Sequence, residues 1–161
     1  MGFFDRFRAP ARTEAAAPLT EERAVAEAQQ HQQTEAARHS FDHEMMALEI
    51  DAAIESHEEW CEQLDSLLKG ADAGDWTPGE VRREDRCGLG HWIEGVSDGP
   101  LGKSGAFIDL RDLHARFHET AARIVSLHLD GDTPQARQLM TGNLHKLNNR
   151  IQQRLDDMKA V

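Results

Sequence analysis

Apolar side chains recur every three or four residues through three long stretches of this chain, and this period is the strongest constraint on its fold. The positions are Met46, Ile50, Ile54, His57, Cys61, Leu64 and Leu68, then Phe107, Leu110, His114, Phe117, His118, Ala121 and Val125, then Ala136, Met140, Leu144, Leu147, Ile151, Leu155 and Met158. The spacing is that of one face of an α-helix, and no segment alternates as a strand would. The sequence therefore predicts an all-α protein.

The breaks between these stretches set the arrangement of the helices. Lys69 and Gly70 are typical of a helix end, Gly131 ends the second stretch, and Thr133 as N-cap with Pro134 at the first helical position opens the third. Long helices joined by loops favour an antiparallel four-helix bundle. A short extra helical segment is expected where the sequence reads RCGLGHW, residues 86–92.

Composition excludes several classes of function. The 161 residues suffice for one domain, and 18 basic against 29 acidic side chains leave a net charge of −11, so a nucleic-acid partner is not expected. No nucleotide-binding glycine motif occurs. With two cysteines, no signal peptide and no run of about 18 to 20 apolar residues, we expect a cytoplasmic protein.

The chain is expected to divide near residue 40. Residues 1–40 form an N-terminal arm, flexible or partly helical, and residues 41–161 form the helix-bundle domain. Within residues 1–12, Phe3, Phe4 and Phe7 lie at helical spacing beside three arginines, which is typical of an element that docks on a partner or on an anionic membrane surface. A disordered terminus is the alternative.

Histidines and one cysteine indicate a metal site. His114 and His118 are four residues apart, which places both imidazoles on one helix face, although the same spacing also fits two histidines on a half-buried stripe. His57 lies in the apolar stripe of the first long helix, and Cys87 lies in a turn with Gly88 and Gly90. Three imidazoles and one thiolate complete a tetrahedral zinc site.

The glycines and the tryptophan of residues 86–92 are assigned roles around that site. Gly88 and Gly90 are expected to adopt dihedral angles that other residues avoid, so that the backbone passes close to the ion. A helix starting near Leu89 would point its free N–H groups at the sulfur and favour the thiolate. Trp92 is expected to cover the site.

Other polar residues are assigned smaller roles. Cys61 is four residues after His57 but is interpreted as a packing thiol, and His91 as solvent-facing. Carboxylates close to the ligands in sequence could accept a ring N–H from a ligand histidine, or merely solvate helix ends; they are Asp85, Asp109 and Asp112. An iron-carboxylate centre would need inward glutamates that the ligand helices lack. Four protein ligands leave no place for a catalytic water, so we do not expect an enzyme.

These residues resemble the chemoreceptor zinc-binding (CZB) domain, a bacterial four-helix-bundle module. The family pattern is a histidine followed closely by tryptophan, then C-x-L-G-x-W, then H-x3-H. Here these are His57 with Trp60, the segment from Cys87 to Trp92, and His114 with His118. The resemblance covers roughly residues 41–158.

The resemblance implies Zn²⁺ held by three histidines and one cysteine, a homodimer, and a role in signalling. Domains of the family are usually appended to chemoreceptors or diguanylate cyclases and respond to zinc or to oxidants. This sequence shows neither a receptor coiled coil nor a cyclase domain, so a chemotaxis or cyclic-di-GMP signalling partner would have to read the site. Two alternatives stay open: a scaffold protein with a purely structural zinc, and a metal-dependent hydrolase with an open coordination position.

Overall fold

The computed structural model describes residues 21–72, 74 and 76–160. The chain divides into two compact units, Met1–Ser40 and Phe41–Val161. The predicted docking element at residues 1–12 lies outside the described residues. Within the first unit, the described residues 21–40 are helical and carry exposed side chains.

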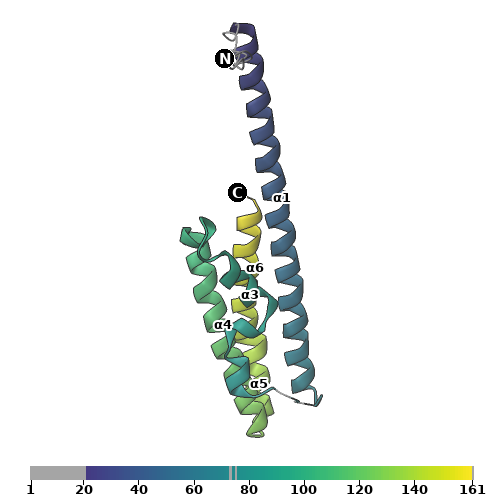
Figure 1. Ribbon diagram of the computed structural model, residues 1–161. Coiled ribbons are helices and arrows are strands. Elements are labelled where there is room, and N and C mark those ends of the chain that lie inside the picture. Colours follow the sequence, from purple (N-terminus) through teal and green to yellow (C-terminus); the bar gives the residue numbers. More distant parts are fainter. Residues whose placement is uncertain (1–20, 73, 75, 161) are drawn as a thin grey trace, which may run out of the picture. The chain divides into compact units, whose positions relative to one another are not determined.

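Three long helical segments and several short ones make up the described chain (Figure 1). Helix α1 spans Glu21–Leu68, α4 spans Gly105–Leu129 and α6 spans His145–Lys159. The short elements are α2 (Pro78–Val81), the 3₁₀ turn η1 (Glu84–Arg86), α3 (Gly88–Val96), the 3₁₀ turn η2 (Leu101–Lys103), α5 (Thr133–Leu139) and the π-helical turn η3 (Met140–Leu144). The described residues contain no β-strand, which confirms the all-α prediction.

The helices end at the glycines that the sequence predicted, and one predicted N-cap is displaced by one residue. Beyond α1, Gly70 has φ +102°, and beyond α4, Gly131 has φ +88°, so both glycines take the left-handed conformation that ends a helix. The cap of α5 is Asp132 rather than Thr133, since the Asp132 carboxylate accepts from the Gln135 N–H. Thr133 is then the first helical residue.

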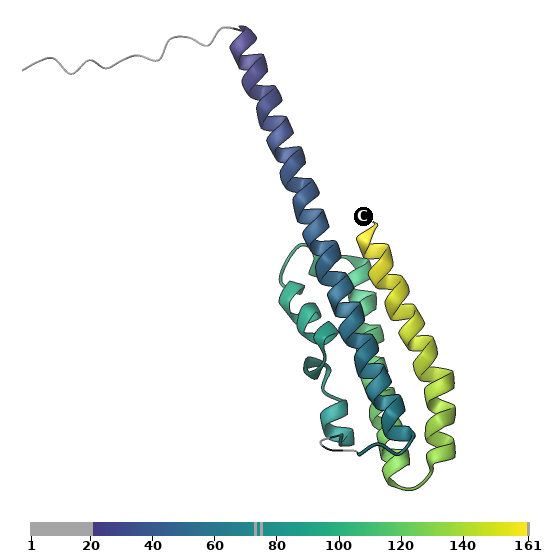
Figure 2. The same cartoon turned by 90° about the vertical axis from the view of Figure 1, so that its right-hand side faces the viewer.

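In the second unit, α1, α4 and α6 run side by side, as the two views of Figures 1 and 2 agree. The short elements α2 and η1 lie along α4, and α3 contacts η1 and reaches α4 where Trp92 packs on Phe107. Elements α5, η3 and α6 follow one another directly in sequence. The second member of the predicted bundle is therefore a broken run of short helices. The antiparallel arrangement of four helices stays a prediction.

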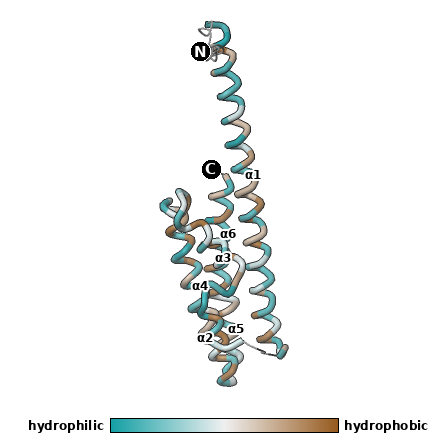
Figure 3. The backbone as a smooth tube through the Cα atoms, in the orientation of Figure 1, coloured by the Kyte–Doolittle hydropathy of each residue, from teal (hydrophilic) through white to brown (hydrophobic). Residues whose placement is uncertain are grey.

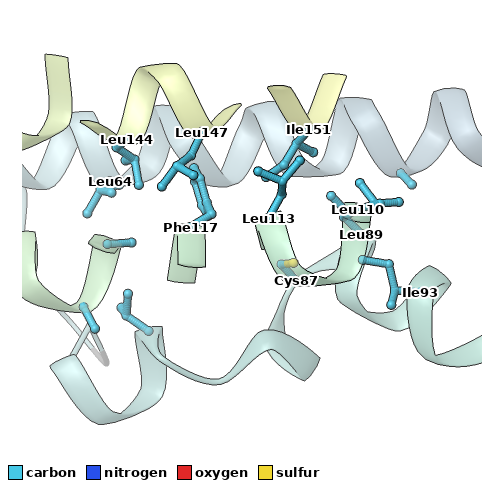
Figure 4. Close-up of a cluster of buried hydrophobic side chains, with 14 of the residues drawn as sticks. Leu64, Cys87, Leu89, Ile93, Leu110, Leu113, Phe117, Leu144, Leu147 and Ile151 are labelled. Carbon is cyan, nitrogen blue, oxygen red and sulfur yellow. The ribbon is translucent and has the colours of Figure 1, made fainter. Parts of the chain in front are cut away.

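The core of the second unit comes from the three stripes read in the sequence. Every stripe residue is buried or half-buried, and Leu64, Phe117, Leu144, Leu147 and Ile151 meet in the cluster of Figure 4. Brown and teal alternate along α4 and α6 in Figure 3, as expected of helices with one apolar face. Burial of these side chains from several helices fixes the positions of the polar groups that lie among them. None of the described helices is long and apolar enough to cross a membrane.

Candidate metal centre

Three separate elements deliver the four predicted ligands to one place in the core. His57 comes from α1, Cys87 is the N-cap of α3, and His114 and His118 come from α4. All four are buried: the three histidines are at most 1% exposed and Cys87 is 4% exposed. Fully buried histidines are uncommon without a partner, so the cluster calls for a chemical explanation.

The distances among these side chains suit a single small ion. Cys87 Sγ lies 3.2 Å from His114 Nε2 and 3.4 Å from His118 Nε2, and the two Nε2 atoms are 3.2 Å apart. Ligand atoms of His57, Cys87 and His114 all lie within 4.8 Å of one another. A tetrahedral zinc with bonds of about 2.0 to 2.3 Å separates its ligand atoms by roughly 3.3 to 3.6 Å. His57 is the most distant member, and its ring is 5.8 Å from that of His114 between centroids.

The turn that carries Cys87 holds the sulfur by its backbone. Cys87 has an extended conformation, with φ −115° and ψ 157°, and its sulfur accepts from the Gly90 N–H at 3.2 Å. Helix α3 begins at Gly88, one residue before the predicted start. The first turn of α3 therefore supplies a donor to the sulfur, as a cap does at any helix N-terminus.

The two glycines of this turn are needed for space and not for unusual dihedral angles. Neither Gly88 nor Gly90 has positive φ, so the predicted reason was wrong. A side-chain carbon at Gly88 would collide with Ser56 of α1. A side-chain carbon at Gly90 would collide with the carbonyl of Glu84 and lie 3.3 Å from His114 Cε1. The glycines thus let α3 approach both ligand helices.

Backbone and side-chain acceptors orient two of the imidazoles. His118 Nδ1 lies 2.7 Å from the carbonyl oxygen of Val81, which can only accept, so Nδ1 carries the proton and Nε2 presents its lone pair to the cluster. His114 Nδ1 lies 3.7 Å from the Glu84 carboxylate, outside hydrogen-bond range but on the side away from Cys87. Glu84 and Val81 were missed by the sequence reasoning, which considered aspartates only. A backbone carbonyl leaves no signal in a sequence.

Burial keeps the three imidazoles neutral. It lowers the pKa of His57 to about 4, with the neighbouring His118 acting in the same direction and the nearby Asn148 amide opposing it. It lowers the pKa of His114 to about 2, aided by His118 and His57. It also lowers the pKa of His118, opposed by the bond to Val81. Neutral imidazoles are the form that binds a metal.

Burial and the head of α3 act in opposite directions on the Cys87 sulfur. Burial raises the pKa of the Cys87 thiol, and the N–H groups of Gly90 and Leu89 oppose this without outweighing it. The N–H groups at the head of α3 therefore favour the thiolate, as predicted, but do not outweigh burial. A cation in the cluster would supply the missing stabilisation of the negative sulfur.

Aromatic rings shield the cluster, and the tryptophan that does so is Trp60. Its ring lies 5.0 Å from His118, 5.6 Å from Phe117 and 5.0 Å from Trp76 between centroids. Trp92, which was expected to cover the site, packs on Phe107 at 6.3 Å. Phe117 also packs on His57 at 4.5 Å. Trp60 is thus the tryptophan whose ring packs against a candidate ligand.

The remaining candidates lie apart from the cluster or at its edge. Asp85 bonds Arg83 at 2.7 Å and Asp109 lies 3.6 Å from Arg154, so neither serves a ligand histidine, and Asp112 is exposed. His91 is exposed, as predicted. Cys61 is half-buried and lines a pocket beside the site.

Buried nitrogen atoms without hydrogen-bond partners in the described part of the chain show that the four side chains fit a zinc ion, whatever family the sequence resembles. Both ring nitrogens of His57 and Nδ1 of His114 are buried and have no hydrogen-bond partner among the described residues. Such groups cost roughly 1 to 3 kcal/mol each when left unpaired in a protein interior. One soft sulfur and three imidazole nitrogens are typical of a closed zinc site.

The comparisons with known proteins agree with this chemistry. Residues 57–125 match the family model of the chemoreceptor zinc-binding domain, and that range begins at His57 and includes Cys87, His114 and His118. No curated protein and no solved structure matches the chain. Residues 57–125 of this chain are therefore similar to the chemoreceptor zinc-binding domain.

Proposed function

We propose that this protein is a zinc-binding regulatory protein that reports metal occupancy, and oxidation of Cys87, to a chemotaxis or cyclic-di-GMP signalling partner. One observation carries the proposal: the four candidate ligands come from α1, α3 and α4, and Cys87 is the sole one of them on the short segment. Bound Zn²⁺ would supply the positive charge that the buried Cys87 thiolate needs.

The residues of the chain determine how binding would change the structure. Cys87 joins the head of α3 to α4 through the two imidazoles, while His57 does the same for α1. Without that link, α3 is held to the rest by buried apolar residues such as Leu89 and Ile93 and by the contact between Gly88 and Ser56. Because α3 has only nine residues, we expect it to be the part of the unit that shifts first.

Four protein ligands would fill a tetrahedral ion, so the proposal is a binding protein and not an enzyme. We also propose a homodimer, on family resemblance, and a signalling partner of the chemoreceptor or diguanylate cyclase type. Sedimentation of the zinc-loaded protein tests the first. Co-purification with a candidate receptor or cyclase, with and without a zinc chelator, tests the second.

The experiment that tests the function is a titration of the purified chain in graded zinc buffers, read by metal content and by the Tm. A regulatory site should bind one ion per chain reversibly at free zinc concentrations reached in cells, with a Tm that follows occupancy. Zinc that stays bound until the chain unfolds would identify a structural site in a scaffold protein. Absence of zinc binding would overturn the proposal.

A further inference from the structure

A pocket next to the candidate metal centre has a lining that the centre itself does not use. It has a volume of about 150 Å³ and lies between α1 and the segment formed by η3 and α6. Its lining residues are Cys61, Asp65, Phe117, Met140, Thr141, Leu144, His145 and Asn148. Sulfur, carboxylate, imidazole and amide groups therefore surround one opening beside a buried metal site.

Along α1, metal-binding side chains form a series that leads from the core to the surface. His57, Cys61 and Asp65 are four residues apart, so they lie on successive turns, about 6 Å from one to the next. His57 is 1% exposed, Cys61 is half-buried and the Asp65 side chain is 43% exposed. Asp65 contacts Lys69 in an exposed ion pair, which is too weak to keep a divalent cation away.

The inner wall of the pocket touches the metal centre. Phe117 lines the pocket and its ring packs on His57 at 4.5 Å. Asn148 lines the pocket as well, lies 4.0 Å from Cys61 Sγ through its Oδ1, and is close enough to His57 to affect the pKa of that imidazole. The buried ligand and the pocket are thus separated by a single layer of side chains.

The outer wall is the π-helical turn η3. Met140, Thr141 and Leu144 of this turn line the pocket, and His145 follows it directly. A π-turn within a helix replaces the ordinary hydrogen-bond pattern and is frequently found at functional sites. The outer wall of the pocket is therefore an irregular turn and not a regular helix.

We infer that this pocket is the entry site for Zn²⁺, in which Cys61, Asp65 and His145 bind the incoming ion and pass it to His57. The inference rests on the proposed function, because a reversible site whose ligands are at most 4% exposed needs a route to solvent. The mixed sulfur, oxygen and nitrogen donors suit a borderline-soft divalent cation.

The pocket is built for transient binding. Its donors do not form a cluster of three within ligand distance, so an ion would be held by one or two side chains and by water. Burial raises the pKa of the Cys61 thiol to about 12. The thiol proton would pass to water when the ion binds sulfur and return when the ion moves to His57. A weaker site ahead of a stronger one is what transfer requires.

The test is stopped-flow measurement of zinc uptake and of zinc release to a chromophoric chelator, with the full chain. We expect the double variant Cys61→Ser with His145→Gln to slow both rates at least fivefold and to leave the equilibrium Kd within twofold. A change in a pathway alters both directions equally, whereas loss of a ligand changes the Kd. His91→Gln, which removes an exposed histidine outside the pocket, is the matched control.

A second variant tests the same inference if the double variant fails to fold. Thr141→Phe fills the mouth of the pocket and keeps every donor, and it should slow both rates in the same way. Two outcomes would overturn the entry site: unchanged rates in both variants, or a weakened Kd caused by faster release alone. In either case, zinc binding by the wild-type chain would still support the proposed function. No zinc binding by the wild-type chain would instead reject the proposed function.

Discussion

The two cysteines of this chain lie in different surroundings. Cys87 is 4% exposed, accepts a backbone N–H at the head of α3 and lies within 3.4 Å of two imidazoles. Cys61 is half-buried, lines a pocket, and its thiol lies 4.0 Å from the Asn148 Oδ1 atom, to which it can donate. Burial raises the pKa of both thiols. The difference shows that convergent donors, and not burial, make a cysteine a candidate ligand.

Replacing each cysteine by serine gives the strongest test of whether Cys87 alone is a zinc ligand. Cys87→Ser should weaken zinc binding by more than the roughly 10- to 100-fold that loss of an outer partner costs, and should lower the Tm of the zinc-loaded protein. Cys61→Ser should leave the equilibrium Kd unchanged. Zinc buffers with a chelator of known affinity measure both. Equal losses in the two variants would show that Cys61 is a ligand.

The turn at Cys87 is tested by two glycines of the same helix. Gly90→Ala places a carbon against the Glu84 carbonyl and beside His114, so it should destabilise the unit by about 1 to 3 kcal/mol and weaken zinc binding. Gly95→Ala meets nothing within 4 Å and should stabilise α3 by up to about 1 kcal/mol. Thermal unfolding of both variants gives the comparison. A harmless Gly90→Ala would mean that α3 does not approach α4 this closely.

The two cysteines should react with an oxidant at different rates. A zinc-bound Cys87 is a thiolate, whereas a Cys61 thiol with a pKa of about 12 stays protonated at neutral pH. Substoichiometric hypochlorous acid should therefore modify Cys87 more than tenfold faster, with release of zinc. Mass spectrometry and a chromophoric chelator follow the two events. Preferential modification of Cys61, or oxidised Cys87 that retains zinc, would remove the oxidant response from the proposal.

The smallest effect is expected from the acid beside His114. Glu84→Gln should weaken zinc binding by about tenfold or less, the low end of the range for outer partners, since its carboxylate is 43% exposed and 3.7 Å from Nδ1. The neighbouring Asp85→Asn, whose carboxylate bonds Arg83, is the matched control. Zinc affinity identical in the two variants would show that Glu84 does not orient His114.

Much of the helical architecture could be predicted because it is local. The period of Ile50, Leu64 and their neighbours indicates which face of α1 is buried, and Gly70 and Gly131 mark helix ends by their conformational freedom. Capping is local too, and its error was one residue at Asp132. The broken segment before α4 was harder to predict, because α2 and η1 are too short to show any period.

The candidate ligands could also be named from the sequence, since imidazole and thiol groups are few and the pattern of residues 57–125 is distinctive. The tertiary structure alone decided what surrounds them. It places the Val81 carbonyl on His118, the Trp60 ring over the same imidazole, and Cys61 in a pocket against η3. Helical periodicity acts within a few residues of the chain, whereas these contacts join residues tens of positions apart, and packing of α1 against α4 and α6 sets them.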